Sequence, residues 1–146
     1  MNHTELVEKY FFNTEHVGEL PLNDNSTVHT RVGSKEQAEY FELYVKLSPP
    51  GAPSAIKQAC FKASGSPYLI AALEWLCREI ESRGREVLKH FQPQELQRLF
   101  KISARNYPTA LLIDKGCKQL LQSLEKMCVI LYRCKIDAKI KGRDDE

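Results

Sequence analysis

Residues 39–47, EYFELYVKL, decide the fold. The apolar positions of this stretch fall on every second residue, at Phe41, Leu43, Val45 and Leu47. Glu42 and Lys46 take the opposite face, so the stretch has the period of a strand that buries one side. A weaker alternation over 27–32, TVHTRV, predicts another strand before it.

The chain is expected to turn back after this strand. Segment 48–54, SPPGAPS, is rich in turn-forming residues, and the next stretch, 55–63, AIKQACFKA, has Ala59, Phe61 and Ala63 on one face. Two strand-like stretches on either side of such a turn predict an antiparallel hairpin. Together with 27–32, the hairpin predicts a three-stranded antiparallel sheet.

Helical periodicity begins at Ser66. Apolar residues recur at spacings of three, four and seven, at Leu69, Ala72, Leu73, Leu76, Cys77 and Ile80. Ser66 suits an N-cap and Pro67 a first helical residue, and Gly84 is expected to end the helix. Three more helices are predicted, over 4–12 with Thr4 as N-cap, over 93–101 and over 109–131. Residues 18–27 are predicted to form a loop, and 133–146 a charged tail that frays.

The order of these elements predicts an α+β fold. Strands grouped together and followed by helices favour a sheet with helices packed on one face, here within a single domain over 1–146. A content of 42% hydrophobic and 27% charged residues fits an ordinary globular chain. The apolar runs 69–73 and 129–132 are far shorter than the ~20 residues that span a bilayer, and the N-terminal sequence has no signal-peptide character. We therefore expect a cytoplasmic protein without a membrane partner.

Charge, cysteines and motifs exclude several function classes. The net charge is +2 with scattered basic residues, so no nucleic-acid partner is expected. The five cysteines, at 60, 77, 117, 128 and 134, form no CxxC pair, which argues against a disulfide framework or a zinc site. Cys77, Cys117 and Cys128 are expected in the core, while the sequence leaves open whether Cys60 is exposed and reactive. The sequence has no HExxH, P-loop or GxSxG motif, so we expect no enzyme activity.

Four segments, in chain order, are similar to the IscU and NifU N-terminal family of iron–sulfur cluster scaffolds. Residues 10–20, YFFNTEHVGEL, resemble the family's Tyr followed by Asn-Pro-Arg-Asn-Val-Gly. Residues 32–43, VGSKEQAEYFEL, resemble Val-Gly-x-x-x-Cys-Gly-Asp-x-x-x-Leu, and 61–73, FKASGSPYLIAAL, resemble Phe-Lys-x-x-Gly-Cys-x-x-x-Ile-Ala. Residues 106–121, NYPTALLIDKGCKQLL, resemble the helix that starts with Ile-His-Cys-Ser. The resemblance covers about residues 6–125 and implies a SufE/NifU-like sandwich.

The thiols that hold the cluster in this family are missing from the matching positions. The resemblance places Gln37 at the first ligand cysteine, Glu39 at the aspartate and Ser66 at the second cysteine, and it places Pro108 and Thr109 near the histidine and the third cysteine. Only Glu39 is a good metal donor, since an amide or a neutral hydroxyl binds iron weakly and proline offers no donor. The Pro-rich stretch that chaperones recognise in the family is also replaced, by 102–108, ISARNYP.

The resemblance implies a degenerate, scaffold-like protein that binds partners instead of holding a cluster on thiols. A cysteine desulfurase or another iron–sulfur assembly protein is the implied partner, docked on the N-terminal region and the surface around 33–39 and Ser66. Two alternatives stay open. The protein could carry iron or a cluster on Glu39 with external thiols, or it could bind a small ligand near Gln37, Ser66 and Thr109. Iron or an iron–sulfur cluster is expected as a cofactor by resemblance only.

Overall fold

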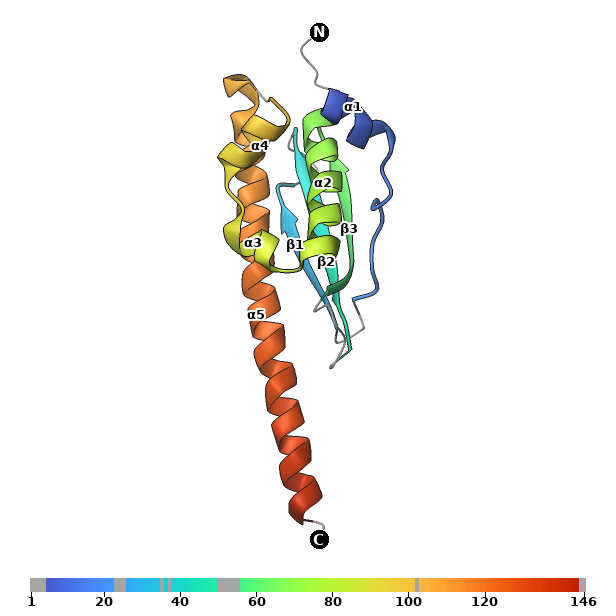
Figure 1. Cartoon of the computed structure of the whole chain (residues 1–146), viewed down its shortest axis with the longest axis vertical. Coiled ribbons are helices and arrows are strands. Elements are labelled where there is room, and N and C mark those ends of the chain that lie inside the picture. Colours follow the sequence, from blue (N-terminus) through green and yellow to red (C-terminus); the bar gives the residue numbers. More distant parts are fainter. Residues whose placement is uncertain are drawn as a thin grey trace.

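The architecture is the α+β sandwich that the sequence predicts (Figure 1). The computed structural model describes residues 5–22, 26–34, 36, 38–49, 56–101 and 103–144, with side chains as far as Met127. Its elements are α1 (Glu5–Phe12), β1 (Thr27–Val32), β2 (Tyr40–Leu47), β3 (Ile56–Ser64), α2 (Pro67–Arg83), α3 (Glu86–His90), α4 (Pro93–Leu99), a 3-10 turn (Ala104–Asn106) and α5 (Tyr107–Asp144).

The sheet has the order β1-β2-β3 with antiparallel pairing throughout. Leu43 in the central strand pairs with Thr30 on one side and with Phe61 on the other. The alternation predicted for β2 is confirmed, because Phe41, Leu43 and Val45 are fully buried. The opposite face carries polar contacts between neighbouring strands, such as His29 with Glu42 at 3.0 Å. One face therefore forms the core with the helices, and the other combines these polar contacts with the buried rings of Tyr40 and Tyr44.

Two helices cover the apolar face, with α2 packed on β3 and α5 on β1. The predicted ends of α2 are confirmed, since Ser66 is its N-cap and Gly84 its C-cap. Helix α5 approaches the sheet closely at Gly116, where a Cβ atom would lie 2.7 Å from Cζ of Phe41. Glycine is therefore required at this contact.

Several predicted bounds are corrected by the structure. Helix α5 runs from Tyr107 to Asp144 instead of 109–131, and its second half extends beyond the sheet (Figure 1). The tail that was expected to fray is therefore helical as far as Asp144. Residues 131–141 contain no Pro or Gly, and Arg133, Asp137 and Lys141 follow the four-residue spacing of opposite charges that favours a helix. Despite its 38 residues, neither α5 nor any other helix in the described ranges is long and apolar enough to cross a membrane.

Smaller differences occur elsewhere. Helix α3 was not predicted, because five residues are too few to show a helical period. Helix α4 ends at Leu99 instead of residue 101, and β2 and β3 each begin one residue later than predicted. The helix predicted over 4–12 is α1, whose proposed N-cap, Thr4, lies outside the described residues.

The described cysteines are all buried. Cys77 and Cys117 belong to the core, as predicted, while the side chain of Cys128 lies outside the described part. Cys60 pairs across the sheet with Tyr44, on the face away from the helices, yet it is only 7% exposed. Burial and the nearby Glu81 carboxylate raise the pKa of the Cys60 thiol. A neutral, unreactive thiol follows for this position.

Candidate functional site

Three of the residues that match the family's ligand positions come from three different elements. Glu39 directly precedes β2, Ser66 caps α2, and Thr109 lies in the first turn of α5. Tyr40 at the start of β2 pairs with Ser64 at the end of β3, and α2 begins three residues after Ser64. This pairing brings Glu39 and Ser66 to the same end of the sheet.

The three side chains form a hydrogen-bonded group, here called the Glu39 cluster. The Thr109 hydroxyl donates to Oε1 of Glu39 at 2.6 Å, and the Ser66 hydroxyl donates to Oε2 at 3.2 Å. The Ser66 oxygen also accepts the N–H of Leu69 at 3.3 Å, which is the capping bond expected from the sequence. Ser66 is therefore both a helix cap and a partner of the carboxylate.

The Glu39 cluster is tightly packed. A Cβ atom on Gly65 would lie 3.2 Å from Cγ of Glu39 and 2.8 Å from Cδ2 of Leu69, so even alanine would crowd the carboxylate. Thr109 is only 4% exposed. Both carboxylate oxygens of Glu39 already accept hydroxyl donors from the protein. The site is therefore closed by its own hydrogen bonds.

The chemistry of this cluster differs from that of a metal centre. A single carboxylate faces two neutral hydroxyls, and soft thiolate donors are missing from all three positions. Within the described ranges, no group of three or more His, Cys, Asp or Glu residues has a metal-binding arrangement. Pro108 is exposed at the start of α5, and Gln37 lies outside the described residues.

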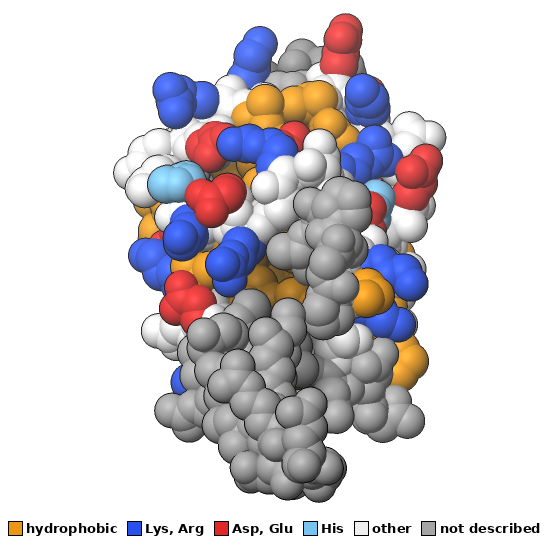
Figure 2. Space-filling view, turned by 60° about the horizontal axis from the view of Figure 1, so that its bottom comes forward, with side chains coloured by type: hydrophobic (Ala, Val, Ile, Leu, Met, Phe, Trp, Pro, Cys, Tyr) orange, Lys and Arg blue, Asp and Glu red, His pale blue; other side chains and the backbone are white. Residues whose placement is uncertain are grey.

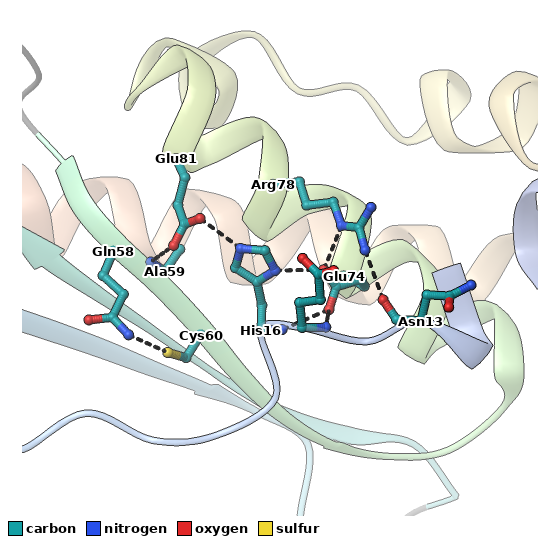
Figure 3. A network of polar contacts seen from close by, with 9 residues as sticks. Asn13, His16, Gln58, Ala59, Cys60, Glu74, Arg78 and Glu81 are labelled. Carbon is teal, nitrogen blue, oxygen red and sulfur yellow. Dashed lines mark hydrogen bonds and ion pairs between the residues drawn. The ribbon is translucent and has the colours of Figure 1, made fainter. Parts of the chain in front are cut away.

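A second polar group, here called the His16 cluster, joins the N-terminal segment to α2 (Figure 3). Nδ1 of His16 lies 2.6 Å from Oε2 of Glu74, and Nε2 lies 2.6 Å from Oε1 of Glu81. The Glu74 side chain is fully buried, whereas the Glu81 side chain is 31% exposed. The imidazole therefore bridges two carboxylates that lie seven residues apart on one helix.

The buried Glu74 carboxylate accepts three further hydrogen bonds. The backbone N–H groups of Glu15 and His16 donate to its Oε1 at 2.8 and 2.9 Å. Nε of Arg78 donates to its Oε2 at 2.7 Å, and Nη2 of the same guanidinium donates to the carbonyl of Asn13 at 2.8 Å. Every lone pair direction of this carboxylate thus has a donor, as a buried charge requires.

The imidazole of His16 and the buried carboxylate of Glu74 favour each other's charged forms. Burial opposes the charge of His16, but hydrogen bonds to Glu81 and Glu74 outweigh burial and raise the pKa of His16. Burial likewise opposes the charge of Glu74, yet hydrogen bonds from Arg78, His16 and Glu15 lower its pKa. The cluster is therefore an ionic contact between an imidazolium and two carboxylates.

No motif or spacing in the sequence singles out this cluster. His16 belongs to no metal-binding or catalytic histidine motif of the sequence, and in the fold its ring joins two segments. Glu74, Arg78 and Glu81 follow a helical spacing of four and three, which is ordinarily the pattern of a solvated helix face. One sequence signal could have identified Glu74: it stands between two large apolar residues, Leu73 and Trp75. Both of these neighbours are buried in the structure.

Apolar side chains are exposed along the segment that carries His16. Among the described residues, the most exposed large hydrophobic side chains are Phe12 at 75%, Val17 at 59% and Leu22 at 56%. On the face drawn in Figure 2, side chains of both charge signs are interspersed, with apolar patches between them.

An open cleft of about 380 Å³ lies between α2 and α4, lined by Trp75, Glu79, Arg83, Glu95, Arg98 and Leu99. The described residues at the family's ligand positions, Glu39, Ser66, Pro108 and Thr109, do not line this cleft.

Comparison with known proteins adds no relative: no family model matches the chain, and no curated protein matches it. The resemblance of about residues 6–125 to the scaffold family therefore rests on the sequence motifs alone.

Proposed function

We propose that this protein is a scaffold-like component of iron–sulfur cluster assembly that acts by binding a partner protein. The observation that carries the proposal is the Glu39 cluster, in which residues from three of the four resembling segments meet through hydrogen bonds of 2.6 and 3.2 Å. Segments matched only by chance would have no reason to bring their ligand positions together. The thiols are replaced by hydroxyls that close the site, which favours partner binding over cluster binding.

The exposed N-terminal segment supports a docking role. Phe12, Val17 and Leu22 present apolar side chains to solvent, and the exposed Glu15 and Glu19 lie between them. Aromatic and aliphatic anchors surrounded by polar residues are typical of protein–protein interfaces. A cysteine desulfurase or another assembly protein with an apolar, basic surface is the proposed partner.

The alternative of a small-ligand site near Ser66 and Thr109 has less support. The polar atoms that would bind a ligand there are already bonded to Glu39. The iron-carrier alternative would require Glu39 to exchange these hydroxyl donors for a metal ion, with thiols supplied from outside. Both alternatives predict a measurable ligand, so they can be separated from partner binding by experiment.

Partner binding is tested by a pull-down with a purified cysteine desulfurase, followed by calorimetric titration. Val17→Asp should weaken binding by about tenfold or more, since a charge would enter an apolar contact. The matched control is Leu99→Asp, because Leu99 is an exposed apolar residue on α4, outside the N-terminal segment. Failure of the wild-type protein to bind a desulfurase or to co-purify with any assembly protein would contradict the proposal.

Cluster binding is tested by anaerobic reconstitution with ferrous iron and sulfide. The wild-type protein should stay colourless and metal-free after desalting, whereas a stoichiometric chromophore that is lost in Glu39→Ala would favour the carrier alternative. The triple variant Gln37→Cys, Ser66→Cys, Thr109→Cys restores the thiols at the family's positions and should gain a chromophore. The control is Thr30→Cys, which places a thiol in β1, outside the Glu39 cluster. This variant should gain no chromophore.

A further inference from the structure

The segment Asn13–Gly18, here called the strap, covers the outer edge of β3. This strand is the last in the order β1-β2-β3, so its outward N–H and C=O groups need partners outside the sheet. The N–H of Phe61 donates to the carbonyl of His16 at 2.9 Å, and the N–H of Gly18 donates to the carbonyl of Phe61 at 2.8 Å. The strap is therefore a short parallel partner of an edge strand.

Polar contacts, more than burial, hold the strap in place. The side chain of Val17, which lies opposite Phe61, is 59% exposed and buries little apolar surface. The strap is fastened instead to α2, through Glu74 and Arg78, and through the imidazole of His16 (Figure 3). Glu81, the other partner of His16, also accepts the N–H of Ala59 in β3 at 2.9 Å. The bridge of His16 between Glu74 and Glu81 thus joins strap, helix and edge strand.

We propose that the strap is a detachable cover of the β3 edge, locked by protonated His16 between Glu74 and Glu81. Only an imidazolium can donate from both ring nitrogens, and an ionised carboxylate can only accept. A neutral imidazole would place a lone pair against one of the two carboxylates, 2.6 Å away. Loss of one proton therefore replaces an attractive contact with a repulsive one.

Release of the strap would expose an edge on which a partner strand could be added. The N–H and C=O of Phe61 would lose their bonds to His16 and Gly18 and become free to pair. Extended peptides bind to such edges through main-chain hydrogen bonds. The inference does not depend on the proposed function, since it concerns the access to β3 alone.

Among the groups near the strap, His16 is the one with an ordinary pKa close to neutral, 6.5, and its two carboxylate partners raise this pKa. The other charged or titratable groups there are Glu74, Cys77, Arg78 and Glu81 on α2, Glu15 on the strap and Cys60 on β3. Hydrogen bonds keep Glu74 ionised, and the hydrogen bond to Glu74 raises the pKa of Arg78, which stays positive. Burial raises the pKa of Cys60, which stays neutral. Alkaline release, at a pH above the ordinary range of histidine, is the expected direction.

The test is amide hydrogen exchange followed by NMR from about pH 6 to about pH 9, with the ¹⁵N signals of the His16 ring recorded in parallel. After correction for the intrinsic pH dependence of exchange, the amides of Glu15, His16, Gly18 and Phe61 should exchange about tenfold faster once His16 loses its proton. The amides of the core residues Leu73 and Leu76 should not change. The midpoint of the exchange curve should coincide with the midpoint of the His16 titration.

Two variants sharpen this test. His16→Gln removes the charge and the double bridge, so the strap amides should exchange fast at every pH. His90→Gln is the matched control, because the His90 side chain is 75% exposed at the end of α3, and its exchange profile should equal that of the wild type. Equal protection of the strap amides across the whole range, or the same pH dependence in His16→Gln, would overturn the proposal. If His16→Gln does not fold, the coincidence of the two wild-type midpoints decides the question.

Discussion

The Glu39 cluster and the His16 cluster both fasten a segment to α2, but their carboxylates differ in burial and in the charge of their hydrogen-bond donors. Glu39 is half-buried and is satisfied by two neutral hydroxyls, from Ser66 and Thr109. Glu74 is fully buried and is satisfied by a guanidinium, an imidazolium and two backbone amides. A carboxylate near solvent can exchange its partners at low cost, whereas a buried one cannot. The comparison therefore separates a site where residues can be replaced from a site that the fold requires.

The largest expected effect is the loss of the buried charge. Glu74→Gln keeps the shape of the side chain but leaves Arg78 without its counter-charge and His16 with Glu81 as its remaining carboxylate partner. Removal of one partner from a buried ion pair typically costs about 3–5 kcal/mol, so the free energy of unfolding should fall by about this amount. Urea unfolding followed by circular dichroism measures the change.

The matched control for this substitution is Glu79→Gln. Glu79 lies on the same helix and pairs with Arg83 at 3.2 Å, but its side chain is 29% exposed and that of Arg83 is 59% exposed. Surface pairs of this kind contribute at most about 1 kcal/mol. If the free energy of unfolding falls by a similar amount in both variants, the buried pair of Glu74 contributes no more to stability than the exposed pair of Glu79.

The next effect is a pH dependence of stability that originates in the His16 cluster. The folded pKa of His16 is raised, so its contribution to stability is complete below its ordinary value of 6.5 and is lost as the pH rises through the folded value. The folded pKa of Glu74 is lowered, so its contribution is present above 4.5 and is lost as the pH falls through the folded value. The free energy of unfolding should therefore decline on both sides of a plateau.

His16→Gln should remove the alkaline decline and leave the acid one. The alkaline effect is expected to be smaller than that of Glu74→Gln, because Glu74 keeps its bonds to Arg78 and to two amides. Urea titrations should end near about pH 8.5, where thiols of the unfolded chain begin to ionise. An unchanged alkaline decline in the variant would assign that decline to another group.

The fold was predictable because its signals are local. The alternation of residues 39–47, the capping pair Ser66 and Pro67, and the apolar stripe of α2 each follow from a few neighbouring residues. The length of α5 was not predictable by the same means. Its carboxyl half lacks an apolar stripe as regular as that of α2, and mixed charges fit a helix as well as a frayed tail.

The two clusters also differ in how far the sequence could predict them. Glu39, Ser66 and Thr109 were identified from the family resemblance, which points to positions that local periodicity cannot join. The His16 cluster was missed because its three side chains on α2 have the spacing of a solvated face. Whether such a face is covered depends on where the chain before β1 lies, and that position is set by the pairing of the strap with Phe61. Long-range pairing of this kind leaves no pattern in a single sequence.

A smaller effect is expected at the Glu39 cluster. Thr109→Val is isosteric and removes the hydroxyl that donates to Glu39 at 2.6 Å, so the free energy of unfolding should fall by about 1–2 kcal/mol. The control is Thr30→Val, which removes an equally short bond of 2.7 Å to the neutral amide of Gln119. A bond to a charged acceptor should cost more to lose than a bond to a neutral one. The measurement is thermal unfolding of both variants. An equal fall of the melting temperature in Thr109→Val and Thr30→Val would indicate that the Glu39 carboxylate is stabilised mainly by solvent.

The smallest effect concerns Ser66, whose two roles can be separated. Ser66→Ala removes the helix cap as well as the bond to Glu39, at a cost of about 1 kcal/mol. Aspartate is as good an N-cap as serine, but in Ser66→Asp its carboxylate would face that of Glu39, where the hydroxyl now lies at 3.2 Å. We therefore expect Ser66→Asp to stay as unstable as Ser66→Ala in urea unfolding, and to regain stability when combined with Glu39→Gln. Full recovery in Ser66→Asp alone would mean that Ser66 acts only as a cap, and that the Glu39 cluster depends on Thr109.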